Sequence, residues 1–185
     1  MITFKRCLTY MKRIPASLGF GVQSPFAYNF IKNVARDSNI SIIKGLVFSL
    51  FFKHSVRKRQ IFYFLSRLSK YSNSDTYFVC EDLYSSFYLN AISVGINRKL
   101  CSFSTYSIIP FALINHHFRS IDSLLDKMSG RSVLIVMDIR IDKQSFNFWN
   151  NILMDTRSGV SFDLYDFGVV FFNKKISKHH YFCNL

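Results

Sequence analysis

The spacing of hydrophobic residues changes along the chain, and the change indicates helices first and alternating strands and helices later. Near the start, Phe26, Phe30 and Val34 recur at intervals of four residues, which places them on one face of a helix. Ser24 followed by Pro25 is typical of an N-cap and a first helical position. We therefore predict a helix that begins at Pro25.

Two other N-terminal stretches have amphipathic patterns. The segment up to Pro15 mixes cations with apolar residues, and it fits either an amphipathic arm or a poorly ordered terminus. The apolar run 40–52 fits a helix or a strand. Residues 54–72 predict a helix with an apolar face and a basic face, the latter formed by Arg57, Lys58, Arg59, Arg67 and Lys70. We expect these five cations to stay solvated.

From residue 76 onward, short β-rich runs alternate with helical patterns. The run 131–138 is almost continuously apolar, which is typical of a parallel strand buried on both faces. Residues 159–173 predict a terminal antiparallel hairpin, placed at one edge of the sheet. The other strands are predicted at 76–80 and 98–104, and the helices at 85–95, 121–130 and 143–153. This order predicts an α/β sandwich with a mostly parallel sheet.

Positive charge is concentrated in the N-terminal part of the chain. The whole chain carries a net charge of +13, and residues 1–70, which hold thirteen Lys or Arg and one acid, contribute +12 of it. We expect a single domain in which this basic helical region packs on a core formed by 71–185. A one-sided field attracts anionic partners, so RNA, an acidic protein or an anionic membrane surface are candidates for the basic face of 54–72. The alternative is a solvated surface without a partner.

The cysteine pattern and the start of the chain favour a soluble cytoplasmic protein. The four cysteines lack the spacing of a zinc site or a redox motif, so we expect no metal centre. Cys80 and Cys101 lie in apolar runs, where free cysteine is usually buried. The first residues have no long apolar region of the kind found in signal peptides. The longest apolar stretch, 45–52, is far shorter than the ~20 residues of a transmembrane helix.

Four stretches resemble parts of a bacterial family of class I S-adenosylmethionine-dependent methyltransferases. Residues 19–34 resemble its N-terminal motif G-x-G-V-H-S-P-F, with Gln23 where the family usually has His. Residues 59–80 resemble the helix that leads into its first strand, 132–152 its fifth strand and following helix, and 161–181 its closing hairpin. The resemblance implies a Rossmann-like class I methyltransferase sandwich and S-adenosylmethionine as cofactor.

The chain departs from this family where the cofactor binds. After its first strand the family has E-x-G-x-x-x-G, whose glycines let backbone N–H groups approach the ligand. Here the stretch is C-E-D-L-Y-S-S-F-Y-L, and no glycine occurs between Gly45 and Gly95. The acid that ends the family's second strand is also missing. The cofactor-binding candidates that the resemblance leaves are Glu81, Asp82, Ser85 and Ser104.

The centre of the fold is expected to be reduced, because about 27 residues separate Ser104 from Ser132 and one βαβ crossover alone takes ~30. Asp138 and His116 are the candidates for catalysis. Asp138 ends the strongest predicted parallel strand, where open α/β sheets bind ligands, although a helix cap is the alternative role. His116, in a His pair, fits a general base or a polar surface.

Three functions stay open at this point. The first is a methyltransferase-like protein with lost or impaired cofactor binding, a pseudoenzyme. The second is an active but divergent methyltransferase. The third is a non-catalytic module that docks an anionic partner on its basic surface.

Overall fold

One seven-stranded sheet organises the described part of the chain. The computed structural model describes residues 4–36, 56–94 and 98–185, so the apolar run 40–52 lies outside it. The strands lie in the order β2-β1-β3-β4-β6-β5-β7. Their bounds are β1 Thr76–Val79, β2 Lys99–Leu100, β3 Phe111–Ile114, β4 Val133–Met137, β5 Ser161–Asp163, β6 Phe167–Phe171 and β7 His180–Phe182. The helices are α1 Phe4–Ser17, α2 Pro25–Phe30 continued by the π-helix η1 Ile31–Ala35, α4 Val56–Ser72, the 3-10 turn η2 Glu81–Leu83, α5 Ser86–Ser93, α6 Ile121–Asp126 and α7 Lys143–Met154.

Parallel pairing dominates the sheet, as the sequence predicts. β2, β1, β3 and β4 pair in parallel, and antiparallel β6 separates β4 from β5. The strand predicted at 131–138 is confirmed as β4, whose residues are all buried. The hairpin is confirmed as β5 and β6, but its position at an edge is wrong. β7 pairs with β5 and forms that edge, and its three residues are too few to give an alternating pattern.

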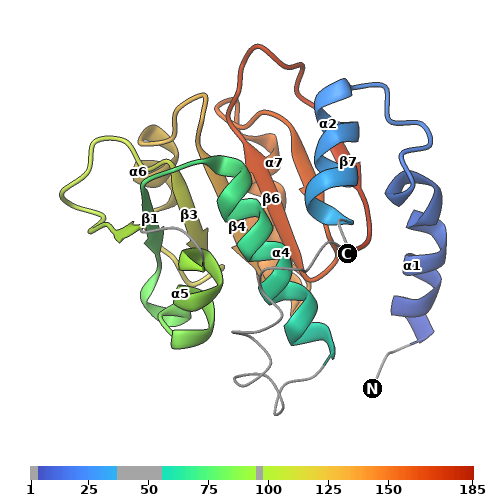
Figure 1. Ribbon diagram of the computed structural model, residues 1–185, viewed down its shortest axis with the longest axis horizontal. Coiled ribbons are helices and arrows are strands. Elements are labelled where there is room, and N and C mark those ends of the chain that lie inside the picture. Colours follow the sequence, from blue (N-terminus) through green and yellow to red (C-terminus); the bar gives the residue numbers. More distant parts are fainter. Residues whose placement is uncertain (1–3, 37–55, 95–97) are drawn as a thin grey trace.

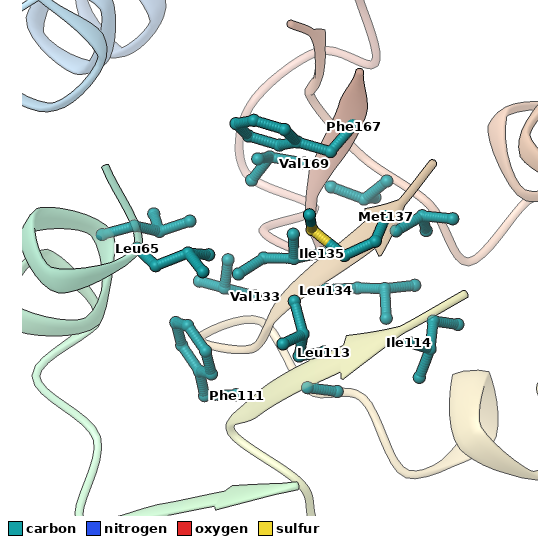
Figure 2. Packing of buried hydrophobic residues seen from close by; sticks show 14 of the residues in the cluster. Leu65, Phe111, Leu113, Ile114, Val133, Leu134, Ile135, Met137, Phe167 and Val169 are labelled. Carbon is teal, nitrogen blue, oxygen red and sulfur yellow. The ribbon is translucent and has the colours of Figure 1, made fainter. Parts of the chain in front are cut away.

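Helices cover both faces of the sheet. α2, α4 and α5 lie on one face, and α6 and α7 lie on the other (Figure 1). Figure 2 shows Leu65 of α4 directed at the sheet on the side of Val133 and Ile135, while Leu134 extends to the other side. All four of these side chains are buried. The alternation along β4 therefore supplies a hydrophobic layer on each face.

Helix α2 ties the N-terminal part of the chain to the hairpin. It begins at Pro25, as predicted, and Ser24 caps it by accepting a hydrogen bond from Ala27 N at 3.3 Å. The centroid of the buried Phe30 ring lies 4.2 Å from that of Phe162 in β5 and 5.2 Å from that of Phe171 in β6. Aromatic contacts of this kind add roughly 0.5–1.5 kcal/mol each beyond the burial of their area.

The centre of the fold is short. The strand predicted at 98–104 is only two residues long, and the chain runs through 101–110 to β3 without a helix. The helices predicted at 85–95 and 143–153 are confirmed as α5 and α7, and the helix predicted at 121–130 is present as α6 but ends at Asp126. The sequence pattern does not predict β3, because its four apolar residues follow Pro110 without alternation. All four are buried, since β1 and β4 flank this strand and helices cover both faces.

Gly168 in β6 has no room for a side chain. A Cβ atom at this position would overlap the buried indole ring of Trp149 in α7. We expect Gly168→Ala to lower the free energy of unfolding by about 1–3 kcal/mol, the usual cost of overpacking, as measured by chemical denaturation. Gly130→Ala is the control, because the nearest atom there, the Phe172 carbonyl oxygen, lies 4.0 Å away. Equal losses in the two variants would contradict the packing of α7 on β6.

Candidate functional site at the carboxyl edge of the sheet

The connections of the sheet place a candidate ligand site at the carboxyl ends of β1 and β3. From β1 the chain passes to β2 on one side, and then it crosses to β3 on the other side. In open α/β sheets, ligands lie in the crevice outside the carboxyl ends of the strands at such a switch point. The segments that meet here are 80–83, after β1, and 115–119, after β3.

A cavity of about 320 Å³ occupies this switch point. Glu81 and Asp82, both candidates for cofactor binding, lie in its lining together with His117. Ser85 and Ser104, the other two candidates, are exposed and do not belong to the lining. The structure therefore brings together two of the four candidate residues. The remaining lining residues are Phe78, Cys80, Phe103, Phe118 and Arg119.

Three aromatic rings form one wall of the cavity. The ring centroids of Phe78, Phe103 and Phe118 lie 5.5–5.6 Å from one another. Phe103 comes from the stretch after β2, where the family resemblance implies the acid that holds a ribose. A hydrocarbon wall cannot accept the hydrogen bonds of ribose hydroxyls, and a buried polar group left unpaired is costly. The cavity thus combines carboxylates and the polar side chains of His117 and Arg119 with an apolar wall on the side of Phe103.

The backbone after β1 forms hydrogen bonds with itself. The N–H groups of Leu83, Tyr84 and Ser85 donate to the carbonyl oxygens of Cys80, Glu81 and Leu83 at 3.0, 3.0 and 2.8 Å. The Leu83 side chain is buried. Three consecutive amides of the turn after β1 are therefore already bonded within the chain.

Asp138 and His116 meet farther along the same edge. Asp138 follows β4 directly and has a φ of +58°. Its side chain reaches solvent, yet the protein packed around it and the charge of Asp166 raise the pKa of its carboxyl, while His116 opposes that rise. His116 Nε2 lies 4.0 Å from Asp142 Oδ2, and its buried Nδ1 has no hydrogen-bond partner among the described residues. His116 therefore lies beside the carboxylate of Asp142 and within electrostatic reach of Asp138.

Two other reactive side chains at this edge are kept neutral. Burial raises the pKa of the Cys80 thiol, which donates a hydrogen bond to Asn115 Oδ1 at 3.9 Å. Burial, together with the charge of Asp138, raises the pKa of Tyr88 to about 12. Because the thiolate and not the thiol is the nucleophile, Cys80 is not activated here.

A buried carboxylate at the β5–β6 turn binds two arginines. Asp163 ends β5, and its side chain is only 1% exposed. Arg13 of α1 donates to Oδ1 of Asp163 at 2.9 Å, and Arg140, from the β4–α7 connection, binds both carboxylate oxygens. Burial alone would raise the pKa of Asp163. The hydrogen bond from Arg140 and the charges of Arg13 and Arg140 outweigh it and hold this pKa below its usual value.

The next carboxylate of the same turn binds two further arginines. Arg6 of α1 and Arg57 of α4 lie 2.7 and 2.5 Å from Oδ2 of Asp166. The Tyr165 ring, on a residue with φ +75°, faces the Arg6 guanidinium at 4.9 Å. Three of the four arginines pair with partners 109–160 positions away, so no local pattern reveals them. We call this group the arginine cluster, formed by Arg6, Arg13, Arg57, Arg140, Asp163, Tyr165 and Asp166.

The expectation that the five cations of 54–72 stay solvated is wrong for two of them. Arg57 is half-buried in the arginine cluster. Arg67 donates to the carbonyl oxygens of Val34 and Ala35 at 2.7 and 3.3 Å, at the end of η1. Carbonyls at a helix C-terminus attract cations, which explains this choice of partner. The three that remain exposed are Lys58, Arg59 and Lys70.

Comparison of the chain with models of protein families, with curated proteins and with solved structures found no match. Within 4–36, 56–94 and 98–185, no group of three or more His, Cys, Asp or Glu is placed to hold a metal ion. No helix of these described ranges is long and apolar enough to cross a membrane. All four cysteines are free, and Cys80 and Cys101 are buried as predicted. What the structure establishes is an α/β architecture compatible with Rossmann-like folds.

Asp163 provides a test of the arginine cluster. Removing its charge leaves two partly or fully buried guanidinium groups without a counter-ion, a change that costs about 3–5 kcal/mol in buried pairs. We expect Asp163→Asn to lower the free energy of unfolding at neutral pH by this amount. Denaturant titration at a series of pH values measures it.

The pH dependence has a defined sign. A carboxyl whose folded pKa is depressed contributes stability above its unfolded pKa, about 3.9, and loses it as pH falls through the folded value. The difference in the free energy of unfolding between the parent protein and Asp163→Asn is therefore constant down to about pH 4 and becomes smaller below it. Asp122→Asn is the matched control, since the 87% exposed Asp122 forms a surface pair with Arg157 and such pairs contribute little. A small, pH-independent effect of Asp163→Asn would rule out the stabilising role of the cluster.

Proposed function

We propose that this chain is a methyltransferase-like α/β protein that does not use S-adenosylmethionine and acts by binding, not by catalysis. Support for the lineage comes from the resemblance of 19–34 and 161–181 to the class I methyltransferase family. The mostly parallel sheet, its C-terminal hairpin and its short centre are compatible with the sandwich which that resemblance implies. On this basis we propose that the sheet and its helices form a class I methyltransferase sandwich.

The turn after β1 is the main support for the proposed loss of cofactor binding. Its three consecutive N–H groups, from Leu83 to Ser85, are bonded to carbonyls of the same turn. Opening the turn for a ligand would sacrifice three hydrogen bonds, each worth roughly 0.5–1.5 kcal/mol net. A side chain at each position would then still separate the backbone from the ligand, which is what glycine avoids. The residues present therefore do not fit S-adenosylmethionine.

The remainder of the crevice supports the same conclusion. Ser102 and Ser104 lie beyond β2, where a ribose-binding acid would be expected, but their hydroxyls are 3.0 Å apart and bond to each other. Phe103, between them in sequence, faces the cavity instead. The cavity volume of about 320 Å³ is at the lower end of the roughly 300–1,000 Å³ typical of ligand pockets.

An active, divergent methyltransferase is the second candidate. The observation that favours it is the presence of Glu81 and Asp82 in the lining of the cavity, since carboxylates can accept hydrogen bonds from ribose hydroxyls. Asp138 and His116 at the same edge would then be the groups that accept a proton. Binding of the cofactor separates this candidate from the first.

The binding role in the proposal belongs to the basic N-terminal part of the chain. The arginine cluster neutralises part of its charge internally, and the structure leaves Lys58, Arg59 and Lys70 of α4 exposed. These exposed cations would attract an anionic partner, which could be RNA, an acidic protein or a membrane surface. Such attraction weakens as salt rises, because exposed charges are screened beyond about 8 Å at physiological ionic strength.

Titration calorimetry of the purified protein with S-adenosylmethionine and S-adenosylhomocysteine tests the loss of cofactor binding. We expect dissociation constants weaker than about 1 mM, equivalent to a binding free energy of no more than about −4 kcal/mol. The physical reason is the set of backbone amides that are already bonded within the turn. A micromolar constant would refute this expectation and establish the second candidate.

Two variants then locate the site if binding is found. Glu81→Ala removes a carboxylate from the cavity lining, and Asp138→Ala removes the carboxylate after β4. In an active divergent enzyme both changes weaken binding. Asp122→Ala is the control, since Asp122 is 87% exposed and does not line the cavity.

A further inference from the structure

Helix α1 turns its apolar side away from the protein. Leu8, Met11, Ile14 and Leu18 follow one another at spacings of three and four residues, so they form one stripe along the helix. Each of these side chains is 39–53% exposed. Phe20, in the turn after the helix, is 71% exposed and extends the stripe. We call these five residues the α1 stripe.

The opposite side of α1 is polar and is held by the protein. Arg6 and Arg13 bind Asp166 and Asp163 in the arginine cluster. Ser17 accepts a hydrogen bond from the backbone N of Asn184 at 2.6 Å. A helix on the surface of a globular protein normally buries its apolar side and exposes its charges. In α1 this orientation is reversed, because Arg6 and Arg13 pair with the partly buried Asp166 and the buried Asp163.

The position of α1 leaves the stripe accessible. In Figure 1 the helix lies at the outer margin of the molecule, next to β7. β7 is the edge strand of the sheet. Contiguous exposed apolar surface on a protein of this size marks a site of contact with another molecule or with a membrane.

The charges around the α1 stripe select the partner. Residues 4–36 contain cations but no Asp or Glu. At the C-terminal end of the stripe, a cavity of about 360 Å³ contains Leu18 and Tyr28 beside the exposed cations Lys32 and Arg36. Lys12 is exposed on α1 itself. An apolar stripe bordered by cations matches the boundary between acyl chains and anionic headgroups of a bilayer.

We propose that α1 is an interfacial helix that lies flat on an anionic lipid surface. The α1 stripe enters the acyl boundary, Lys32 and Arg36 bind lipid phosphates, and the arginine cluster holds the other side of the helix on the protein. The inference is independent of cofactor binding, because none of these residues lines the switch-point cavity.

Other occupants fit the same surface less well. A second copy of the chain would bring together two segments that carry cations and no acids, so the pair would repel. RNA binds through its phosphates and through stacking on aromatic rings or guanidinium groups, and it does not use Met11 or Ile14. A lipid surface satisfies the apolar and the basic parts together.

Co-sedimentation with vesicles tests the proposal. The probes are phosphatidylcholine vesicles with and without about a third of phosphatidylglycerol, since anionic lipid supplies the surface potential. We expect binding to the anionic vesicles and little binding to pure phosphatidylcholine. Met11→Ser/Ile14→Ser should weaken vesicle binding by at least about tenfold, because two side chains no longer enter the acyl boundary. Lys32→Gln/Arg36→Gln should weaken binding to the anionic vesicles and leave the weak binding to pure phosphatidylcholine unchanged.

The matched control is Ile141→Ser/Met154→Ser, which removes two apolar side chains that are at least as exposed but lie outside α1. It should bind vesicles like the parent protein. Because all four of these side chains are exposed, neither double variant should change the free energy of unfolding, and denaturation of each confirms this. Equal loss of binding in both double variants, or no binding to anionic vesicles, would overturn the proposal.

Cys7 provides a second, local measurement. It is exposed on α1, four residues before Met11, whereas Cys80, Cys101 and Cys183 are buried, so a thiol-reactive dye labels one position. A polarity-sensitive dye on Cys7 should shift to shorter emission wavelengths when anionic vesicles are added. A shift caused instead by raising protein concentration would assign the stripe to a second copy. If the emission stays unchanged with vesicles and the protein instead binds RNA, with an affinity that Met11→Ser/Ile14→Ser does not alter, then the partner of the basic surface is nucleic acid and the lipid proposal is overturned.

Discussion

The buried carboxylate of Asp163 is the interaction on which the arrangement of this molecule depends. It ends β5, and two guanidinium groups reach it from opposite ends of the sequence, Arg13 in α1 and Arg140 after β4. A buried carboxylate without such partners would be strongly destabilising, so the three residues have to meet in the folded state. Their meeting fixes α1 beside the edge of the sheet and orients its polar side inward. The outward apolar side of α1 is a direct consequence.

A Rossmann-like protein would bind a ligand at the carboxyl edge of the sheet. In this chain, polar groups at that edge form hydrogen bonds and ion pairs with other groups of the chain itself. At the β1–β3 switch point, the turn after β1 bonds its own amides, and the ring of Phe103 faces the cavity. At the β5–β6 turn, the arginine cluster fills the same edge with internal ion pairs. Both halves replace contacts to a ligand by contacts within the protein. This agrees with the proposal that the chain is methyltransferase-like and acts by binding.

Elements that depend only on neighbouring residues could be predicted from the sequence. The continuous apolar run of β4 and the Ser24–Pro25 start of α2 each depend on neighbouring residues only, and both are confirmed. β3 and β7 could not be predicted, because short strands flanked by irregular segments have no period of their own. Glu81 and Asp82, which the family resemblance implies as cofactor-binding residues, follow β1 and line one cavity. The arginine cluster was missed since Arg13 and Asp163 lie 150 positions apart, and only the tertiary fold brings them together.

Amide NMR tests whether the backbone after β1 is closed to a cofactor. The measurement is a titration of the isotopically labelled protein with S-adenosylhomocysteine up to millimolar concentration, following the N–H signals of Leu83, Tyr84 and Ser85. These N–H groups donate to carbonyls of their own turn. We expect that their chemical shifts do not move and that their exchange with solvent stays unchanged. Saturable shifts at these three amides would show that the turn opens to the ligand and that the backbone after β1 is not closed to a cofactor.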